Sequence, residues 1–270
     1  MSQQPPQPPQ PQAYPPQQHY PPPPSGGMSG AVIALIVTGV VALVVIMLLI
    51  AILLPALGAA RRTAKRMQNS TQLRGIHQGM VTYANSNRDH FPGLDAMGNI
   101  LPNGIDTGNS GDGDTVEARY WILLNNGFIT PEYAISPSEV APMIEWGAGP
   151  VQSMNYSYAL LSIDGSPGAS PGTGDPLVPH RWNEWAQSLN TQAVVGGDRN
   201  TGTNATSGVQ SIHTSQPGEW KGSVLWNDNH VSFESTPVVA TRYDSGAMNN
   251  QDNLFEAAGD TDAYLIHQGD

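Results

Sequence analysis

Ala31 to Tyr83 read AVIALIVTGVVALVVIMLLIAILLPALGAARRTAKRMQNSTQLRGIHQGMVTY. This stretch begins apolar and uncharged, becomes basic in its middle, and ends with apolar residues at helical spacing. One continuous helix, apolar in its first half and amphipathic in its second, accounts for all three parts. We therefore predict a Pro/Gln-rich tail at 1–30, a transmembrane helix at 31–60, a helical stem at 61–92 and an acidic head at 93–270.

The apolar part is long enough to cross a lipid bilayer. No charged residue lies between Ala31 and Leu54. At about 1.5 Å per residue, a helix of this length covers a hydrocarbon core of about 30 Å. A buried core helix is the alternative, but such a helix rarely lacks a polar face over this length. We expect a single-pass membrane protein that has the lipid bilayer as a partner.

Basic residues directly after the apolar run form a collar on the expected helix. Arg61 and Lys65 are four residues apart, as are Arg62 and Arg66. Anionic headgroups attract such side chains by about 1 kcal/mol each near the surface, so we assign these residues to the membrane interface. The positive-inside rule alone places the chain beyond the collar in the cytoplasm, but the rule loses force ahead of a long translocated domain.

The stem carries an apolar stripe. Leu73, Ile76, Met80 and Tyr83 recur at spacings of three and four residues, which places them on one helical face. We predict that this face packs against a sheet in the head. His77 lies beside the stripe and is expected at its boundary rather than as a metal ligand.

Charge is divided unevenly along the chain. The first 74 residues contain five Lys/Arg and no Asp or Glu, so the remainder holds six Lys/Arg and all 22 acids. An acidic head repels phosphate backbones, so nucleic acid is not an expected partner. Solubility explains the acidity most simply, and divalent cation binding is the alternative. With no cysteine in the chain, disulfides and thiolate sites are excluded.

Residues 1–24 consist mainly of Pro and Gln and carry no charged side chain. Proline fixes φ and removes a hydrogen-bond donor, so we expect a disordered tail of polyproline II character. Such a tail is either a plain spacer or a ligand for aromatic grooves.

The head pattern predicts an α+β fold. We expect a short helix at Glu117–Asn126 and strands at Met154–Leu161, Gln192–Val195, Ser223–Trp226, His230–Glu234 and Pro237–Arg242. Asn227-Asp228-Asn229 predicts a hairpin turn between the third and fourth of these strands. Residues 163–180 and 197–219 are expected as long polar loops, and the C-terminal acidic region shows little strand pattern. The predicted architecture is a long N-terminal transmembrane helix whose stem packs on a small antiparallel sheet with long loops.

Catalytic motifs are missing from the sequence. It contains no GxSxG, HExxH, P-loop or GxGxxG in a βαβ setting. We therefore predict a protein that is not an enzyme, with no catalytic residues and no bound cofactor. Trp182, Trp185 and Trp220 lie in polar regions, where they either stack on sugars or cap a small core.

Two metal sites are open alternatives. Asp112 and Asp114, in a Gly-Asp-Gly-Asp loop, offer the oxygen ligands that Ca²⁺ prefers, without the EF-hand spacing. His213, Asp228 and His230 form a metal site if the late hairpin brings them together. Otherwise, His213 hydrogen-bonds within its loop and Asp228 shapes the turn.

Several short motifs occur along the chain in the same order as in a known protein family. LLPAL followed by ARR ends the apolar run, and the stem and its end match a pattern of the type NLRQLGLALxxYxxxxxxxFP. The matching residues of the stem are Gln72, Leu73, Gly75, Tyr83, Phe91 and Pro92. Further matches are GFITPE at 127–132, ISPS at 135–138, NYSY at 155–158, and His213 followed by GSVLWNDNHVSF at 222–233. The chain thus resembles type IV pilin-like proteins, in particular the pseudopilin-like group common in Planctomycetes.

This resemblance implies a pilin-like fold with a cytoplasmic tail and an extracytoplasmic head. It implies a structural role in a secretion or pilus-type assembly, with other pilin-like subunits or the secretion machinery as partners. Pilin precursors carry a basic leader and a Glu at the fifth mature position, whereas this chain has neither. The alternative is that the pilin-like helix serves only as an anchor for a head that binds a glycan or calcium.

Overall fold

The computed structural model describes residues 26, 29–104, 106–163, 179–214, 216–257 and 262–267. Nearly all of the predicted Pro/Gln-rich tail and most of the predicted loop at 163–180 lie outside these residues. Contacts divide the chain into two compact units, Met1–Ala56 and Leu57–Asp270.

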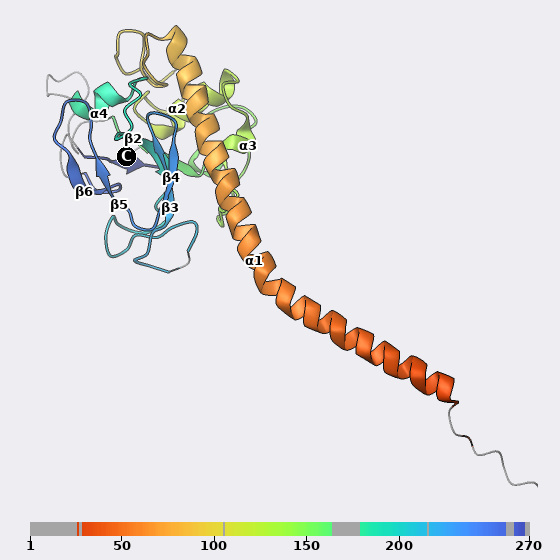
Figure 1. The fold of residues 1–270 in the computed structure, drawn as a ribbon. Helices are drawn as coiled ribbons and strands as arrows, with labels where there is room; N and C mark the ends of the chain where they lie inside the picture. Colours follow the sequence, from red (N-terminus) through yellow and green to blue (C-terminus); the bar gives the residue numbers. More distant parts are fainter. Residues whose placement is uncertain are drawn as a thin grey trace, which may run out of the picture. The chain divides into compact units, whose positions relative to one another are not determined.

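The helices are α1 (Gly30–Ser86), α2 (Val116–Asn125), α3 (Pro131–Ala134), the 3₁₀ turn η1 (Ser153–Asn155) and α4 (Pro179–Glu184). The strands are β1 (Tyr158–Leu161), β2 (Val194–Asp198), β3 (Gly222–Trp226), β4 (Val231–Glu234), β5 (Val238–Thr241), β6 (Asn249–Asn253) and β7 (Leu265–Ile266) (Figure 1).

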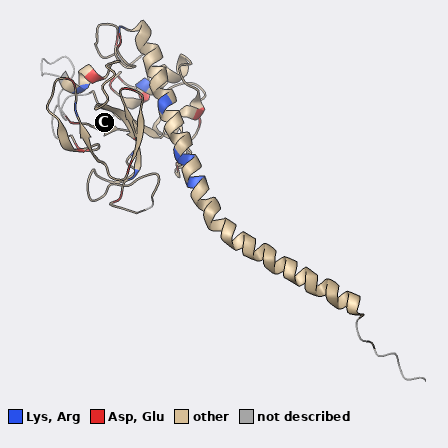
Figure 2. Cartoon of the chain, viewed as in Figure 1, with Lys and Arg blue, Asp and Glu red and all other residues tan. Residues whose placement is uncertain are grey.

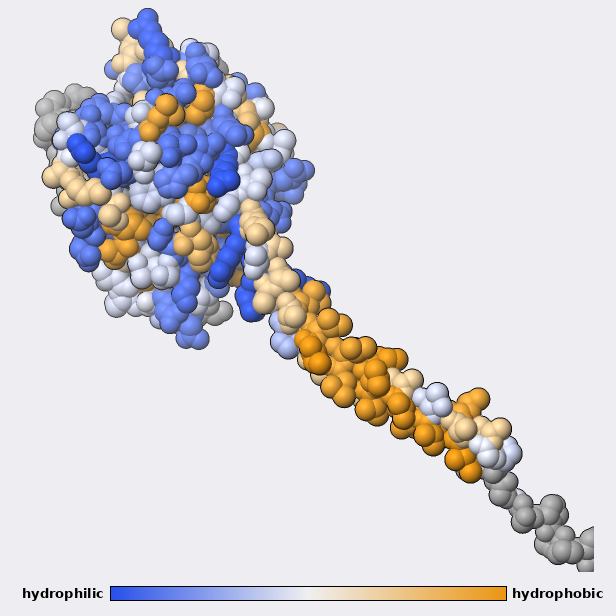
Figure 3. All heavy atoms as spheres, in the orientation of Figure 1, coloured by the Kyte–Doolittle hydropathy of each residue, from blue (hydrophilic) through white to orange (hydrophobic). Residues whose placement is uncertain are grey.

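The first half of α1 exposes apolar side chains around its whole circumference. The most apolar stretch of 18 residues in this helix has a mean hydropathy of 3.3, and none of it is buried inside the protein. Leu53 and Leu54, for example, are 62% and 63% exposed. Figure 3 shows hydrophobic residues along this part of the helix. Apolar surface of this extent is unusual for a protein surrounded by water. By length and composition, this part of α1 is a candidate single membrane span.

The second half of α1 belongs to the head. Leu73, Ile76 and Met80 are fully buried, and Tyr83 is half-buried with its hydroxyl donating to the Leu94 carbonyl at 2.9 Å. Leu73, Ile76 and Met80 share one apolar core with residues of β1, β2 and β3. Figure 1 shows this part of α1 beside β3 and β4.

His77 is buried at 1% exposure, so the prediction that it lies at the boundary of the stripe is wrong. The segment after α1 folds back over the helix, and the Phe91 ring meets the His77 ring edge-on at 5.6 Å between centroids. Periodicity within one helix does not reveal a covering segment of this kind. Burial lowers the pKa of His77 below its ordinary value, so the imidazole is neutral in the core at neutral pH.

The main sheet has five strands in the order β4-β3-β2-β1-β7, with antiparallel pairing between neighbours. The predicted hairpin is confirmed: Gly222 pairs with Glu234 and Leu225 with Val231. Asn229 has a φ of 68°, which places it in the left-handed region that Asn tolerates in tight turns. A second sheet pairs β5 with β6.

Some element boundaries differ from the sequence prediction. β1 starts at Tyr158 rather than Met154, because η1 occupies the preceding residues. The first two residues of α4 and the last two residues of β2 lie in regions predicted as loops. β6 and β7 lie in the C-terminal region, where the sequence showed little strand pattern. β6 reads NNQDN, so its strand conformation follows from pairing with β5 and not from its own propensity.

Candidate functional site

A buried polar cluster joins α1 to the sheet. Asn69, fully buried on α1, donates from Nδ2 to both carboxylate oxygens of Asp198, at 2.8 and 3.0 Å, and to Ser223 Oγ at 2.9 Å. Its Oδ1 accepts hydrogen bonds from Ser136 Oγ at 2.6 Å and from the Tyr158 hydroxyl at 2.8 Å. Both ends of the amide are therefore satisfied by groups from four other segments. A buried polar group with this many partners specifies one relative placement of helix and sheet.

Asp198 is the acceptor at the centre of this cluster. Besides Asn69, its Oδ2 accepts from the Ser223 backbone N–H at 2.6 Å and lies 2.8 Å from Nε2 of His213. Because a carboxylate can only accept a hydrogen bond, a neutral His213 ring carries its proton on Nε2, the nitrogen that faces Asp198. Asp198 was not predicted as a site residue from the sequence. The only available signal was a charged residue at the end of the buried run Val-Val-Gly-Gly-Asp.

Among the described residues, the structure does not bring His213, Asp228 and His230 together into the metal site considered as an alternative. His230 hydrogen-bonds to Asp228 within the β3–β4 turn. His213 lies toward the other end of this hairpin, where its ring meets the Phe233 ring edge-on at 5.4 Å. Burial opposes ionisation of Asp228, but the hydrogen bonds and charge of His230 outweigh it and lower the pKa of the Asp228 carboxyl.

The two residues considered as candidate calcium ligands make contacts of a different kind. Asp112 Oδ1 accepts from the Asn103 backbone N–H at 2.7 Å, and the backbone carbonyl of Asp114 accepts from Arg119. Among the described residues, no group of three or more His, Asp or Glu side chains is placed to hold a metal ion.

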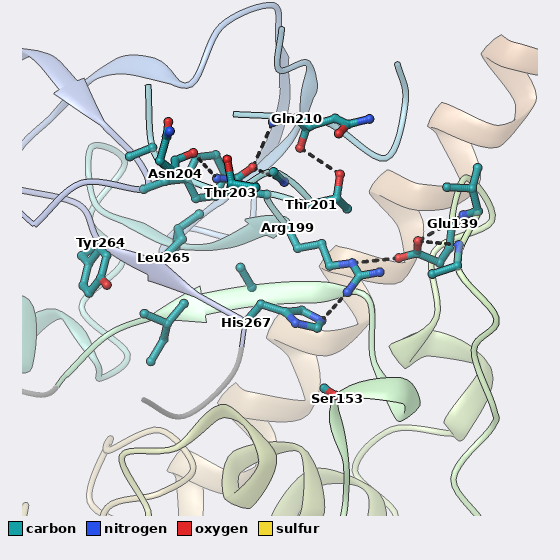
Figure 4. Close-up of a pocket in the computed structure, with 18 residues that line it drawn as sticks. Glu139, Ser153, Arg199, Thr201, Thr203, Asn204, Gln210, Tyr264, Leu265 and His267 are labelled. Atoms are coloured by element: carbon teal, nitrogen blue, oxygen red, sulfur yellow. Dashed lines mark hydrogen bonds and ion pairs between the residues drawn. The ribbon is translucent and has the colours of Figure 1, made fainter. Parts of the chain in front are cut away.

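A polar groove of about 820 Å³ lies on the head (Figure 4). One wall is formed by the loop after β2, and the opposite walls come from Glu139–Ala141 and from the segment around β7. Hydroxyl and amide side chains of the β2 loop face this space, together with two aromatic rings. These residues are Thr201, Thr203, Asn204, Gln210, Phe255 and Tyr264.

Charged groups of the polar groove compensate one another. Arg199 Nε donates to Glu139 Oε2 at 3.1 Å, and Arg199 Nη1 lies 3.5 Å from Nε2 of His267 (Figure 4). Burial acts to raise the pKa of the Glu139 carboxyl, but the hydrogen bond and charge of Arg199 and two backbone N–H groups hold it below its ordinary value. Burial, reinforced by the Arg199 charge, lowers the pKa of His267 to about 4. At neutral pH these three side chains therefore sum to no net charge.

Two of the three tryptophans considered for sugar stacking are inside the core. Trp185 and Trp220 are 0% and 1% exposed, and Trp185 Nε1 donates to the Pro92 carbonyl at 2.9 Å. Trp182 is half-buried. The core-capping alternative is therefore correct for Trp185 and Trp220, which offer no face to a sugar.

A smaller cavity of about 180 Å³ lies where the basic collar meets the head, and we call it the foot cavity. Its lining consists of Arg62, Lys65, Arg66, Ser138, Ile212 and His213. Figure 2 shows basic residues gathered on this part of α1. The Arg66 guanidinium packs over the Phe233 ring at 4.1 Å from its centroid. Three residues predicted at the membrane interface therefore also border the folded head, whereas Arg61 does not line the cavity.

Comparisons with family models, with curated proteins and with solved structures gave no match to this chain.

Proposed function

We propose that this chain is a membrane-anchored, pilin-like structural protein of the pseudopilin kind that works in a secretion or pilus-type assembly. The observation that supports this proposal is the division of α1. Its first half exposes only apolar and small side chains over the length of a bilayer, and its second half is buried in an α+β head. The tail lies in the cytoplasm and the head is extracytoplasmic.

The fixed junction between stem and head favours a structural role. Asn69 and the apolar stripe hold α1 against the sheet through both polar and apolar contacts. A subunit that assembles through its helix needs the head held rigidly to that helix, because neighbouring heads must repeat at a constant spacing. The long helix and small antiparallel sheet are compatible with the pilin-like resemblance of the sequence.

Orientation and assembly are both testable with cysteine reporters, because the chain has no native cysteine. Ser2→Cys places a thiol in the tail, and Met97→Cys places one on the head at a position that is 80% exposed. We expect a membrane-impermeant maleimide to label Met97→Cys in intact spheroplasts and Ser2→Cys only after lysis. The reverse pattern would overturn the proposed orientation.

Assembly is tested by a thiol in the span. Leu43→Cys should give disulfide-linked dimers on mild oxidation if helices of neighbouring subunits pack together. Ser2→Cys, on the tail, serves as the matched control for random collision. Equal yields from both positions would contradict assembly through the helix and leave the anchored form of the protein.

The polar groove favours a second candidate function, binding of an uncharged glycan. Its lining combines hydroxyl and amide groups with Phe255 and Tyr264, and its charged side chains are mutually neutralised. Uncharged sugars are bound by polar groups together with apolar ring faces. A glycan array probed with the full chain tests this candidate. Thr203→Trp, which fills the groove, should abolish binding, and Thr236→Trp, at an exposed position outside the groove, should not.

A further inference from the structure

The foot cavity gathers positive charge, and its lining in the described part of the chain contains no acidic side chain. The ion pairs among the described residues do not include Arg62 or Lys65, and Arg66 packs on an aromatic ring. Asp198 is the acid bonded to the cavity residue His213. It is fully buried, and its oxygens are already occupied by Asn69, His213 and the Ser223 backbone. An anion entering this cavity therefore meets two cations, Arg62 and Lys65, that form no ion pair with any described residue.

The remaining lining suits an oxyanion. Ser138 contributes a hydroxyl that can donate, and His213 presents an imidazole whose Nε2 is held by Asp198. Guanidinium groups match phosphate oxygens with paired N–H donors, and an ammonium adds a compact point charge. With water occupying ~30 Å³ per molecule in the liquid, a cavity of about 180 Å³ admits one phosphate group and a few waters.

We propose that the foot cavity is a binding site for a single anionic phosphate group. Arg62 and Lys65 supply the charge, Ser138 supplies a hydroxyl, and His213 forms the inner wall. The Asn69–Asp198 cluster holds this wall in place, because Asp198 bonds both to α1 and to His213. The site therefore exists only when stem and head are docked, and a bound phosphate would favour the docked state.

Two sources can supply this phosphate group. One is the headgroup of an anionic phospholipid, because the cavity lies one to two helical turns beyond the apolar run. The other is a phosphate ester or inorganic phosphate in solution. The lipid source rests on the proposed membrane anchoring, whereas binding of soluble phosphate does not.

The test compares two double variants that remove equal charge from the head. R62Q/K65Q changes two residues that line the cavity, and R74Q/R88Q changes two exposed basic residues outside both the cavity and the collar. Full-length protein is reconstituted in phosphatidylcholine nanodiscs, and binding of inorganic phosphate is measured by calorimetry. In a second arm, native mass spectrometry measures retained lipid after release from nanodiscs of mixed phosphatidylcholine and phosphatidylglycerol.

We expect R62Q/K65Q to weaken phosphate binding or phosphatidylglycerol retention about tenfold or more, and R74Q/R88Q to leave it within about twofold. Ser138→Asp, which places a carboxylate in the cavity, should have the same effect as R62Q/K65Q by an independent route. Near-UV circular dichroism checks that each variant is folded.

An effect in the lipid arm alone identifies the headgroup as the source, and an effect in the phosphate arm alone identifies a soluble ligand. Equal losses in the two double variants, or no binding by the parent protein in either arm, would overturn the proposal. Failure of the protein to enter nanodiscs would count against the membrane anchoring, and the phosphate arm in detergent would still test the site.

Discussion

Asn69 connects one turn of α1 to four other segments of the head through a single amide. Burial of an amide is costly unless its hydrogen bonds are replaced, and here the partners include the carboxylate of Asp198. The amide donates on the side that faces Asp198 and accepts on the side that faces Ser136 and Tyr158. A side chain with only donors or only acceptors cannot meet both demands.

Asn69→Asp tests this arrangement with almost no change of shape. The new carboxylate faces Asp198 at hydrogen-bonding distance, so we expect a loss of about 3 kcal/mol in the free energy of unfolding at pH 7. The loss should shrink at low pH, because a proton shared between the two carboxyls relieves their repulsion. Denaturant titrations of the full chain in detergent at several pH values measure both effects. Gln68→Glu, at the exposed neighbouring position, is the control and should change stability little. Equal effects of the two substitutions would contradict the role of Asn69.

Asp252 should make the stability of the head depend on pH. Its Oδ2 accepts from the Thr241 hydroxyl and from the Ala263 backbone N–H, and burial raises the pKa of its carboxyl from 3.8 to about 6. The folded protein thus holds this proton more tightly than the unfolded chain does. The resulting stabilisation is complete below pH 3.8 and is lost as the pH rises through 6.

Asp252→Asn removes this titration while keeping an acceptor oxygen for both partners. We expect the substitution to raise the melting temperature relative to the parent protein above pH 6 and to give a smaller advantage or none near pH 4. Thermal unfolding of both proteins across this pH range provides the measurement. A constant difference at all pH values would show that ionisation of Asp252 does not contribute.

At the scale of elements, close packing between α1 and the segment after α2 limits which residues the stem accepts. A Cβ on Gly79 would lie 2.7 Å from Ile129 Cγ2 and 3.1 Å from the Phe128 carbonyl oxygen. A backbone oxygen cannot move aside as a flexible side chain does. Gly79 is therefore required by the approach of a neighbouring segment, although glycine weakens a helix interior.

Gly79→Ala should destabilise the head by about 1–2 kcal/mol, because overpacking outweighs the gain of about 1 kcal/mol in helix propensity. Gly58→Ala on the same helix is the matched control, since its Cβ would meet only Arg62 Nη1, at 3.8 Å. We expect this control to be neutral or slightly stabilising. Thermal unfolding of the two variants side by side distinguishes packing from propensity, and a stabilising Gly79→Ala would contradict the packing argument.

Elements with a local signal were predictable from the sequence. The length of α1 followed from hydropathy and periodicity. The β3–β4 hairpin followed from a turn of Asn and Asp between apolar runs, and α2 was placed within one residue at each end. β6 and β7 were not predicted, because a polar strand and a two-residue strand are defined by their partners.

The same distinction applies to the candidate sites. The collar residues were recognisable from spacing alone. The pairing of His213 with Asp198, and not with Asp228, depends on the register of β2 against β3 and on the path of the intervening loop. The polar groove is likewise assembled from segments far apart in the chain, so its residues carried no sequence signal.

At the scale of the whole molecule, the first half of α1 should determine whether the protein stays in the membrane. Placing Arg at the centre of a span costs about 2.5–3.5 kcal/mol per residue, so the double variant L43R/V44R should shift the protein from the membrane pellet to the soluble fraction after carbonate extraction. L43A/V44A keeps the segment apolar and should remain in the pellet. Retention of L43R/V44R in the membrane pellet would show that the apolar half of α1 does not anchor the protein in the membrane.

The docking of α1 on the sheet also determines how the head withstands mechanical force. The chain enters the head at the N-terminal end of the stem and leaves α1 at Ser86, on the far side of Asn69 and the apolar stripe. A force that pulls on the membrane anchor therefore acts parallel to α1 and loads its contacts with the head in shear. Several hydrogen bonds and buried side chains resist this force at the same time. The helix cannot be peeled from the sheet one contact at a time, so the subunit should yield abruptly at high load and show little gradual extension before that point.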